Sequence, residues 1–198
     1  PDGYHELQTL FQLVDLADEL RVEVRADGEL RRIGGPAGVP HDEDLVVRAA
    51  RLLKQASGSP LGADLTLTKR IPLGGGLGGG SSDAATTLAA LNVLWRTRAS
   101  AEDLARLGIA LGADVPVFLF GRSAWAEGVG ERLTAVDLPP RWYAIVRPPV
   151  AVSTAEVFQA PELTRNSPRT TIRGFLEAGG RNDCAPVVVA RHADVARA

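Results

Sequence analysis

Six glycines surround a single leucine between Leu73 and Ser81, and this run carries the clearest chemical meaning in the sequence. Each glycine in an ordered segment costs roughly 0.5 to 1 kcal/mol relative to alanine, so such a run is kept where bare backbone is needed. Glycines let successive N–H groups curl around an anion, and a helix that begins after them adds free N–H groups and a positive dipole end. The run therefore predicts a polyphosphate-binding loop, because a flexible linker would carry serine and proline as well.

Two familiar phosphate-binding loops fit this run poorly. A Walker A loop has a lysine directly before its serine or threonine, and Gly80 stands in that position. The dinucleotide-binding spacing occurs as Gly74, Gly76 and Gly79, but almost any glycine spacing occurs in a run this rich. A Rossmann oxidoreductase would also need an acidic residue after a second strand about 20 residues further on, where this sequence stays helical until Trp95.

The residues on both sides of the run predict that a strand leads into it and a helix follows it. Leu65 and Leu67 alternate with threonines, which is typical of a strand. Within 81–95, apolar side chains recur on one face of a helix. Ser81 and Ser82 stand at the expected helix start, where their hydroxyls can cap the helix or contact phosphate or Mg²⁺.

Two further helices are expected. One covers 41–53, behind a short acidic stretch that suits a helix N-terminus. The other begins at Ser100, where Ser100 and Asp103 form a reduced capping box, and it stops at Gly112. Asp114 follows this stop directly and, from the residues alone, can be a turn or capping aspartate.

Strand patterns occupy much of the remaining chain. Apolar runs within 7–24 predict strands, and the turn signal Asp27-Gly28 predicts a hairpin between them and the next apolar residues. The segments 123–127 and 132–136 are expected to be strands on either side of a glycine turn, and 142–146 a buried strand.

Composition favours a globular protein that binds a small molecule. The chain has 198 residues, 45% of them hydrophobic, with a formal net charge of -2 and scattered basic residues, which argues against nucleic-acid or membrane-surface binding. Cys184 has no cysteine to pair with, and neither a secretory leader nor a long apolar run is present, so we expect a cytoplasmic protein. Because the chain opens at Pro1 and stops at Ala198 within a helical pattern, we expect further sequence on both sides.

The segment 72–85 is similar to the phosphate-binding motif of the GHMP kinases, a family of small-molecule kinases. Other stretches resemble, within it, the 4-diphosphocytidyl-2-C-methyl-D-erythritol kinase family. They are 1–11, 45–50, 111–118, 126–131 and 182–184. The resemblance covers nearly the whole chain and implies the α+β GHMP kinase fold. It implies an N-terminal ATP-binding domain at 1–140, with a mixed sheet and helices on one side, and the start of a smaller α/β C-terminal domain at 141–198.

The resemblance also implies an activity and a set of site residues. That family uses ATP and Mg²⁺ to phosphorylate the 2-hydroxyl of its cytidine-containing substrate, in the non-mevalonate (MEP) route to isoprenoid precursors. Asp114 matches its catalytic aspartate, the base that accepts the hydroxyl proton. The residues expected at the nucleotide are Lys69, Pro72, Leu73, Gly74, Gly75, Gly76, Leu77, Gly78, Gly79, Gly80, Ser81 and Ser82. No protein ligand to a metal is assigned.

Tyr4 and His5 match the family's cytidine site, and Phe158 matches a second ring that stacks on the base. From the residues alone, Tyr4 can equally be a surface aromatic, Phe158 a core ring, and Lys69 a solvated lysine at a strand end. The family's lysine on its first strand has no counterpart here, because no lysine precedes Lys54. Its motif is therefore expected upstream of Pro1.

Two other functions stay open at this point. One is another GHMP kinase, acting on mevalonate, homoserine or a sugar. The other is a nucleotide-binding module without catalysis.

Overall fold

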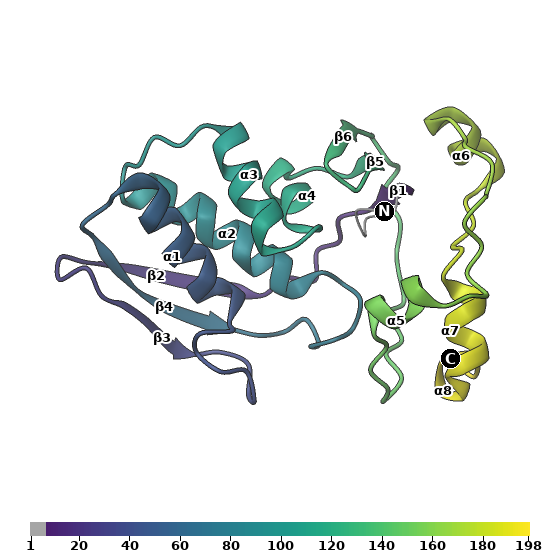
Figure 1. The fold of residues 1–198 in the computed structure, drawn as a ribbon, viewed down its shortest axis with the longest axis horizontal. Coiled ribbons are helices and arrows are strands. Elements are labelled where there is room, and N and C mark those ends of the chain that lie inside the picture. The colour runs from purple at the N-terminus through teal and green to yellow at the C-terminus, as the bar shows by residue number, and fades with distance from the viewer. Residues whose placement is uncertain (1–6) are drawn as a thin grey trace. The chain divides into compact units, whose positions relative to one another are not determined.

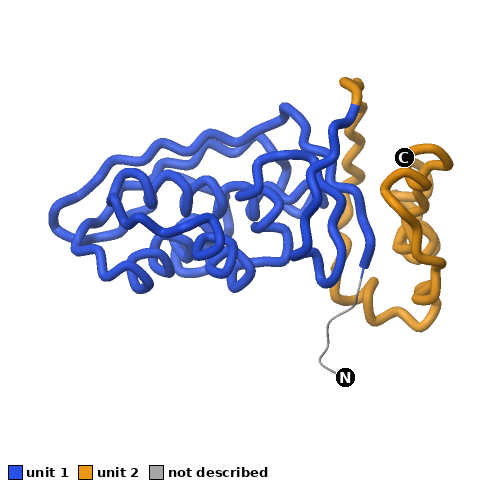
Figure 2. The backbone as a smooth tube through the Cα atoms, turned by 90° about the horizontal axis from the view of Figure 1, so that it is seen from above, with its two compact units in different colours: residues 1–138 blue, residues 139–198 orange. Residues whose placement is uncertain are grey.

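The computed structural model describes residues 7–198, which divide into two units between Leu138 and Pro139 (Figure 2). The first unit contains both sheets. The second contains short helices. Each unit is described by itself below.

A three-stranded sheet forms the base of the first unit, in the order β2-β4-β3. β2 (Glu19–Arg25) pairs antiparallel with β4 (Gly62–Thr68), and β3 (Leu30–Gly34) pairs parallel with β4, so the sheet is mixed. A parallel pair needs a crossover connection, and α1 (Leu45–Ser57) supplies it.

The hairpin expected at Asp27-Gly28 is wrong, because β4 lies between β2 and β3. The turn itself is present. Gly28 has φ 76°, and the Asp27 carboxylate accepts a hydrogen bond from the N–H of Glu29 at 3.0 Å. A turn signal fixes the local bend, whereas strand pairing depends on which segment fills the space beside each strand. Here the backbone of Gly62 fills that space, since a Cβ on Gly62 would lie 2.0 Å from the carbonyl oxygen of Glu29.

Two helices, α1 and α2 (Gly79–Leu94), cover one face of this sheet (Figure 1). Their apolar sides and the inner face of β4 form the main core, in which Leu53, Leu65, Leu88 and Leu91 are fully buried. The helix expected at 41–53 starts instead at Leu45, because Asp44 caps it.

Two more helices pack beside α2. The capping box predicted for α3 (Ala101–Leu111) is confirmed, with Ser100 and Asp103 exchanging backbone-to-side-chain hydrogen bonds, and Gly112 ends the helix. α4 (Val115–Phe120) follows after one turn and contacts both α2 and α3.

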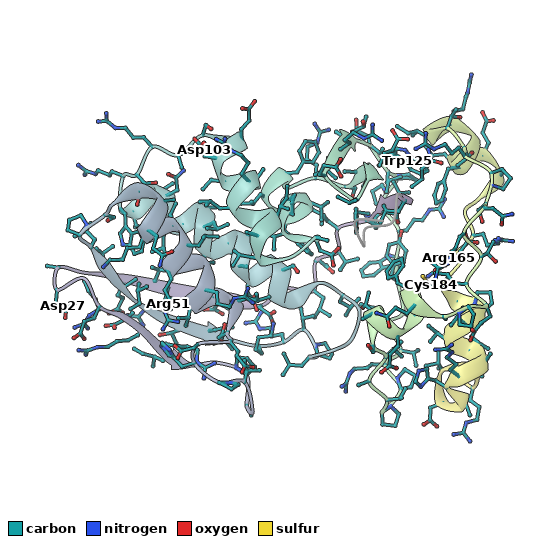
Figure 3. All side chains as sticks on the ribbon, viewed as in Figure 1. Asp27, Arg51, Asp103, Trp125, Arg165 and Cys184 are labelled. Carbon is teal, nitrogen blue, oxygen red and sulfur yellow. The ribbon has the colours of Figure 1, made fainter. Side chains whose placement is uncertain are left out.

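A second, antiparallel sheet completes the first unit, in the order β1-β5-β6. Its strands are β1 (Leu7–Phe11), β5 (Ala124–Gly128) and β6 (Arg132–Ala135), which confirms the two strands predicted around the glycine turn. Trp125 of β5 is buried (Figure 3).

The second unit consists of α5 (Thr154–Gln159), α6 (Ile172–Ala178), α7 (Ala185–Arg191) and α8 (Ala193–Ala196). Val157, Leu163 and Val187 form a small buried cluster. The strand predicted at 142–146 is wrong. No described strand pairs with this segment, and Trp142 is fully exposed. Apolar residues form a strand only where a neighbouring strand satisfies their backbone N–H and C=O groups. None of the helices described in 7–198 is both long and apolar enough to cross a membrane.

Candidate functional site

The carboxyl ends of β3 and β4 and the N-termini of α1 and α2 meet at one edge of the mixed sheet. Leu45, the first residue of α1, lies 3.2 Å from where a Cβ on Gly80 would be, so the two helices begin side by side. At the opposite edge, the indole N–H of Trp95 donates to the carbonyl oxygen of Gly62 at 3.1 Å, which ties the end of α2 to the start of β4. Ligands of α/β layers bind at the edge where strands end and helices begin.

The two helix N-termini differ in how their free N–H groups are satisfied. At α1 the carboxylate of Asp44 accepts from the N–H of Val46 at 2.9 Å and also pairs with Arg32 at 2.7 Å. At α2 the capping residue is Gly78, which has no side chain to offer. A side chain therefore caps α1, whereas no side chain caps α2.

The first turn of α2 presents unpaired backbone donors. The N–H of Ser82 bonds the carbonyl of Gly78 at 2.8 Å, but those of Gly79, Gly80 and Ser81 have no acceptor within residues 7–198. Such groups, at the positive end of a helix dipole, bind anions. The N-capping interpretation of Ser81 and Ser82 is wrong, because both lie inside the helix.

The glycines of the loop are required for two different reasons. Gly74, Gly76 and Gly78 have φ between 66° and 70°, a left-handed conformation that side chains disfavour. From Gly78 onward, close packing adds to this. A Cβ would lie 2.8 Å from the Phe118 ring at Gly78 and 2.8 Å from Ile71 at Gly79. The loop thus keeps its backbone bare where it meets α2.

The turn that carries Asp114 lies beside this helix start. A Cβ built on Gly112 would be 3.7 Å from the Ser81 hydroxyl, and one on Gly130 would be 3.8 Å from the carbonyl oxygen of Ala113. The turn is thus positioned between the first turn of α2 and the β5–β6 turn. Asp114 comes at its end, directly before α4.

The carboxylate of Asp114 is free of competing contacts. It does not cap α4, and within residues 7–198 it makes no hydrogen bond or ion pair. The residue reaches the surface, but surrounding protein atoms reduce the hydration of its carboxyl group, and this desolvation raises the pKa of Asp114. An unpaired carboxylate with a raised pKa is a competent proton acceptor.

Lys69 is not the solvated lysine that its position at a strand end allows. Its ammonium group pairs with the carboxylates of Asp18 and Asp83, at 2.7 Å for Asp83. The three side chains are nearly buried, with 14%, 3% and 7% exposure for Lys69, Asp18 and Asp83. We call these three residues the Asp18 cluster.

The two carboxyl groups of the Asp18 cluster have pKa shifts in opposite directions. Burial alone would raise the pKa of Asp18, but hydrogen bonds from Lys69 and from the N–H groups of Ile71 and Arg70 outweigh it and lower the pKa. For Asp83, burial dominates and raises the pKa to about 6, despite the contact with Lys69. Burial would lower the pKa of Lys69, but its two carboxylate partners raise it. Asp18 thus holds the lysine as a firmly ionised partner.

None of the residues expected at the substrate belongs to the described part of the first unit. Tyr4 and His5 lie outside the described residues. Phe158 belongs to the second unit, where its partly buried ring packs against the small buried cluster that contains Val157, Leu163 and Val187.

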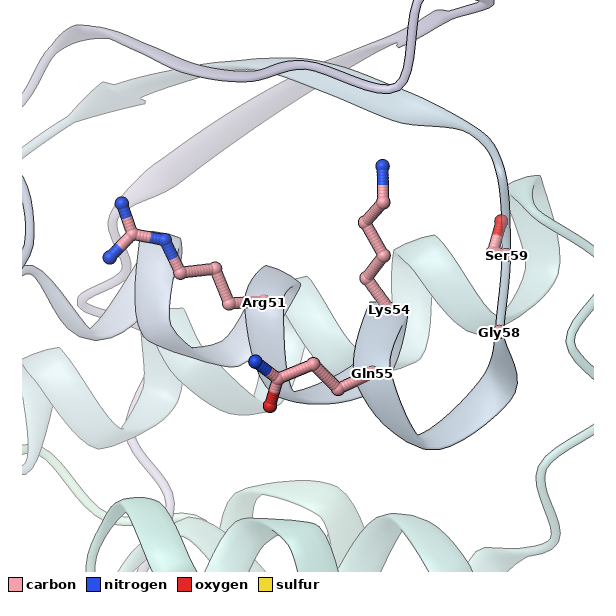
Figure 4. Close-up of a pocket in the computed structure, with 5 residues that line it drawn as sticks. All are labelled: Arg51, Lys54, Gln55, Gly58 and Ser59. Atoms are coloured by element: carbon pink, nitrogen blue, oxygen red, sulfur yellow. The ribbon is translucent and has the colours of Figure 1, made fainter.

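Two surface hollows are found elsewhere in the first unit. The larger, of about 370 Å³, lies at the C-terminal end of α1 (Figure 4). Its lysine, Lys54, already donates to the carbonyl oxygens of Gly28 and Leu61, and Arg51 pairs with Asp42. The other, of about 330 Å³, is bordered by Arg122 and Asp137, which pair with each other. Their charged groups are engaged within the protein, so neither competes with the glycine loop as an anion site.

No group of three or more His, Cys, Asp or Glu side chains gathers to hold a metal ion in the part of the chain that the structure describes. A divalent cation that arrives with a polyphosphate needs few protein ligands, because phosphate oxygens and water supply most of them.

Comparison with known proteins adds an independent finding. The GHMP kinases N terminal domain matches residues 44–122. A 4-diphosphocytidyl-2-C-methyl-D-erythritol kinase from Pseudomonas aeruginosa is 60% identical over 197 residues, which is 100% of this chain and 70% of the relative. A crystal structure of 4-(cytidine 5'-diphospho)-2C-methyl-D-erythritol kinase superimposes with a TM-score of 0.77 at 41% identity, covering 96% of this chain and 70% of the other.

A homoserine kinase from Cytophaga hutchinsonii superimposes with a TM-score of 0.57 at 21% identity, covering 80% of this chain and 54% of that one. At this identity the likeness concerns the fold alone. Together with the mixed sheet and its covering helices, it agrees with the α+β GHMP kinase fold expected from the sequence.

Proposed function

We propose that this chain, which belongs to the 4-diphosphocytidyl-2-C-methyl-D-erythritol kinase family, transfers the γ-phosphoryl group of ATP to the 2-hydroxyl of 4-diphosphocytidyl-2-C-methyl-D-erythritol. The reaction belongs to the MEP route to isoprenoid precursors. One structural observation carries the proposal: an uncapped helix start with free N–H groups lies beside a turn that ends in an unpaired aspartate.

The glycine loop and the first turn of α2 fit the phosphates of ATP. The N–H groups of Gly79, Gly80 and Ser81 are free to bind phosphate oxygens, and Gly78, which has no Cβ, lets the start of the helix pack closely against the Phe118 ring. The loop residues from Pro72 to Leu77 would border the nucleotide. ATP supplies the phosphoryl group, and Mg²⁺ would come with it, with the hydroxyls of Ser81 and Ser82 as the nearby protein oxygens.

Asp114 would accept the proton of the attacking 2-hydroxyl. A general base works best when its pKa is not far below the operating pH, and desolvation raises the pKa of Asp114 in that direction. In its ionised form the carboxylate can take the proton as the hydroxyl oxygen bonds to phosphorus.

The cytidine end of the substrate is assigned through the family alone. Tyr4 and Phe158 would stack on the base, and His5 would contact its edge. We also keep the division into an ATP-binding domain at 1–140 and the start of a C-terminal domain at 141–198 as part of this proposal.

The alternatives have less support. The likeness to a homoserine kinase is one of fold, whereas the relatives that match the whole chain at about 60% identity are kinases of the cytidine substrate. Binding of the cytidine diphosphate ester, with no binding of mevalonate or homoserine, would separate the proposed kinase from another GHMP kinase. Turnover of ATP would exclude a module without catalysis.

The decisive experiment replaces Asp114 by Asn in the full-length protein. We expect phosphoryl transfer to fall by about 10² to 10⁴, the usual contribution of a general base, while ATP affinity changes little. Transfer is measured with a coupled ADP-release assay in the presence of the cytidine substrate, and ATP affinity by calorimetry.

A matched control is Asp137→Asn, which removes an exposed aspartate paired with Arg122, away from the proposed site. It should leave both measurements unchanged. Full turnover in Asp114→Asn would remove Asp114 from the mechanism. Wild-type protein that binds ATP but never consumes it would favour the non-catalytic module.

A further inference from the structure

We propose that Asp18 is a positioning residue for nucleotide binding, which fixes the junction between β4 and the glycine loop and acts through Lys69 on the start of α2. The inference rests on the proposed function, since it concerns the same nucleotide site. Asp18 was not singled out by any sequence motif, and it precedes β2, far in sequence from the loop that it contacts.

Asp18 makes contacts to three consecutive residues at the junction. One carboxylate oxygen accepts from the N–H of Arg70 at 2.6 Å and from the N–H of Ile71 at 2.8 Å. The other carboxylate oxygen pairs with the Lys69 ammonium group. These residues follow the last residue of β4 and lead into Pro72, so Asp18 determines the direction in which the chain enters the loop.

Lys69 carries this constraint to α2. Its ammonium group also bonds Asp83, which lies in the first part of that helix, at 2.7 Å. A Cβ on Gly79 would lie 3.2 Å from the Lys69 nitrogen and 2.8 Å from the Ile71 side chain. Lys69 and Ile71 therefore form the surface on which Gly79 rests. A shift of either residue would move the first free N–H group of the proposed phosphate site.

The charges of the cluster also define what Lys69 can do. Two carboxylates surround one ammonium group, and Lys69 is largely buried between them. To reach a phosphate, the ammonium group would have to leave both partners. We therefore assign Lys69 to positioning as well, in place of the direct phosphate contact that its nearness to the loop suggests.

The two roles of Lys69 predict opposite effects of Asp18→Asn. If Lys69 contacted phosphate, the loss of one competing negative charge would tighten ATP binding. If the cluster positions the loop, the change weakens binding. An asparagine has one acceptor oxygen and one NH₂ group, so it cannot accept from both N–H groups and from Lys69 as the carboxylate does.

The experiment measures ATP binding by calorimetry, and KM for ATP and kcat by the coupled assay, in the full-length protein. We expect Asp18→Asn to raise the dissociation constant and KM for ATP about tenfold, the effect of losing one hydrogen bond to a charged group, and to leave the KM of the cytidine substrate unchanged. Lys69→Arg, which keeps the positive charge between the two carboxylates, should retain most of the ATP affinity.

The matched control is Asp64→Asn. Asp64 pairs with Arg25 at 3.0 Å in the same sheet, near the opposite end of β4, and its side chain is also mostly covered. It should lower thermal stability without changing KM for ATP, so a general loss of stability is distinguished from a local effect.

The outcomes are distinct. Asp18→Asn with wild-type ATP affinity, or with tighter binding, overturns the inference even if the variant is less stable. If the wild-type protein itself fails to bind ATP, the proposed function fails instead. Should Asp18→Asn not fold, Asp18→Glu keeps the charge but displaces the acceptor atoms, and an unchanged KM for ATP in that variant would equally overturn the inference.

Discussion

Replacement of Asp83 by Asn should change how the stability of this protein depends on pH. Asp83 is buried beside Lys69, and burial raises the pKa of its carboxyl group from 3.8 to about 6. An acid that binds its proton more tightly in the folded state stabilises the fold below its unfolded pKa. That contribution is lost as the pH rises through the folded pKa. The contribution of Asp83 to the stability of the wild-type protein should therefore be lost between about pH 4 and pH 6.

The magnitude follows from the two pKa values. The difference between 3.8 and about 6 corresponds to about 3 kcal/mol in the free energy of unfolding, when the solution passes from below both values to above both. Asp18 acts in the opposite direction and in a different range. Its pKa is lowered, so its contribution is present above the unfolded value and is lost as the pH falls through the lower folded value.

Asp83→Asn keeps the shape of the side chain and an oxygen that can accept from Lys69, while Asp18 remains to neutralise the lysine. The variant should thus lack the decline between pH 4 and pH 6, and it should be more stable than the wild type at pH 8 by up to about 3 kcal/mol.

Urea unfolding of both proteins at intervals from pH 4 to pH 8 measures this, because groups elsewhere titrate equally in both and cancel in the difference. Asp137→Asn serves as the control, since its exposed side chain should give a curve parallel to the wild type. Parallel curves for the wild type and Asp83→Asn would refute the raised pKa and with it the account of the cluster.

Two further predictions concern the proposed site. Gly78→Val should weaken ATP binding at least tenfold by calorimetry, because a Cβ 2.8 Å from the Phe118 ring at φ 66° would displace the start of α2 and its free N–H groups. Gly121→Val has the same left-handed strain with open space around it and should leave ATP affinity unchanged, so equal effects of both variants would contradict the prediction. The pH profile of kcat/KM should fall on the acid side with a midpoint above 3.8, since Asp114 must be ionised to act and desolvation raises its pKa. A profile flat down to pH 4 would argue against this base.

Local signals predicted local structure well. The capping box at Ser100 and the glycine at 112 set the two ends of α3, because caps act within one turn of the helix. The turn signal at Asp27 was equally correct about the bend and wrong about the pairing, since β4 comes from a later part of the chain. The apolar segment at 142–146 has the composition of a strand, but no described strand pairs with it.

The residues of the proposed site likewise include some that the sequence predicted and some that it did not. The glycine run indicated free backbone N–H groups because few other structures need so many glycines, and the start of α2 has them. Asp114 came from family resemblance rather than from its own spacing. Asp18 could not be found, because a carboxylate that contacts residues 51 to 53 positions away leaves no periodic pattern. Such contacts depend on the antiparallel register of β2 and β4, in which Glu19 is opposite Thr68.

The caps of the two helices explain why we propose the anion site at α2 and not at α1. Both helices begin at one edge of the sheet, so both dipoles point their positive ends toward the same region. At α1, Asp44 fills that position with its own carboxylate, which Arg32 holds in place. At α2 the capping residue is a glycine, and Asp83, the first acidic residue of the helix, lies beyond its first turn and bonds Lys69. Asp18 also pairs with Lys69, and because no side chain caps α2, its first N–H groups stay free for the phosphates of ATP that we propose there.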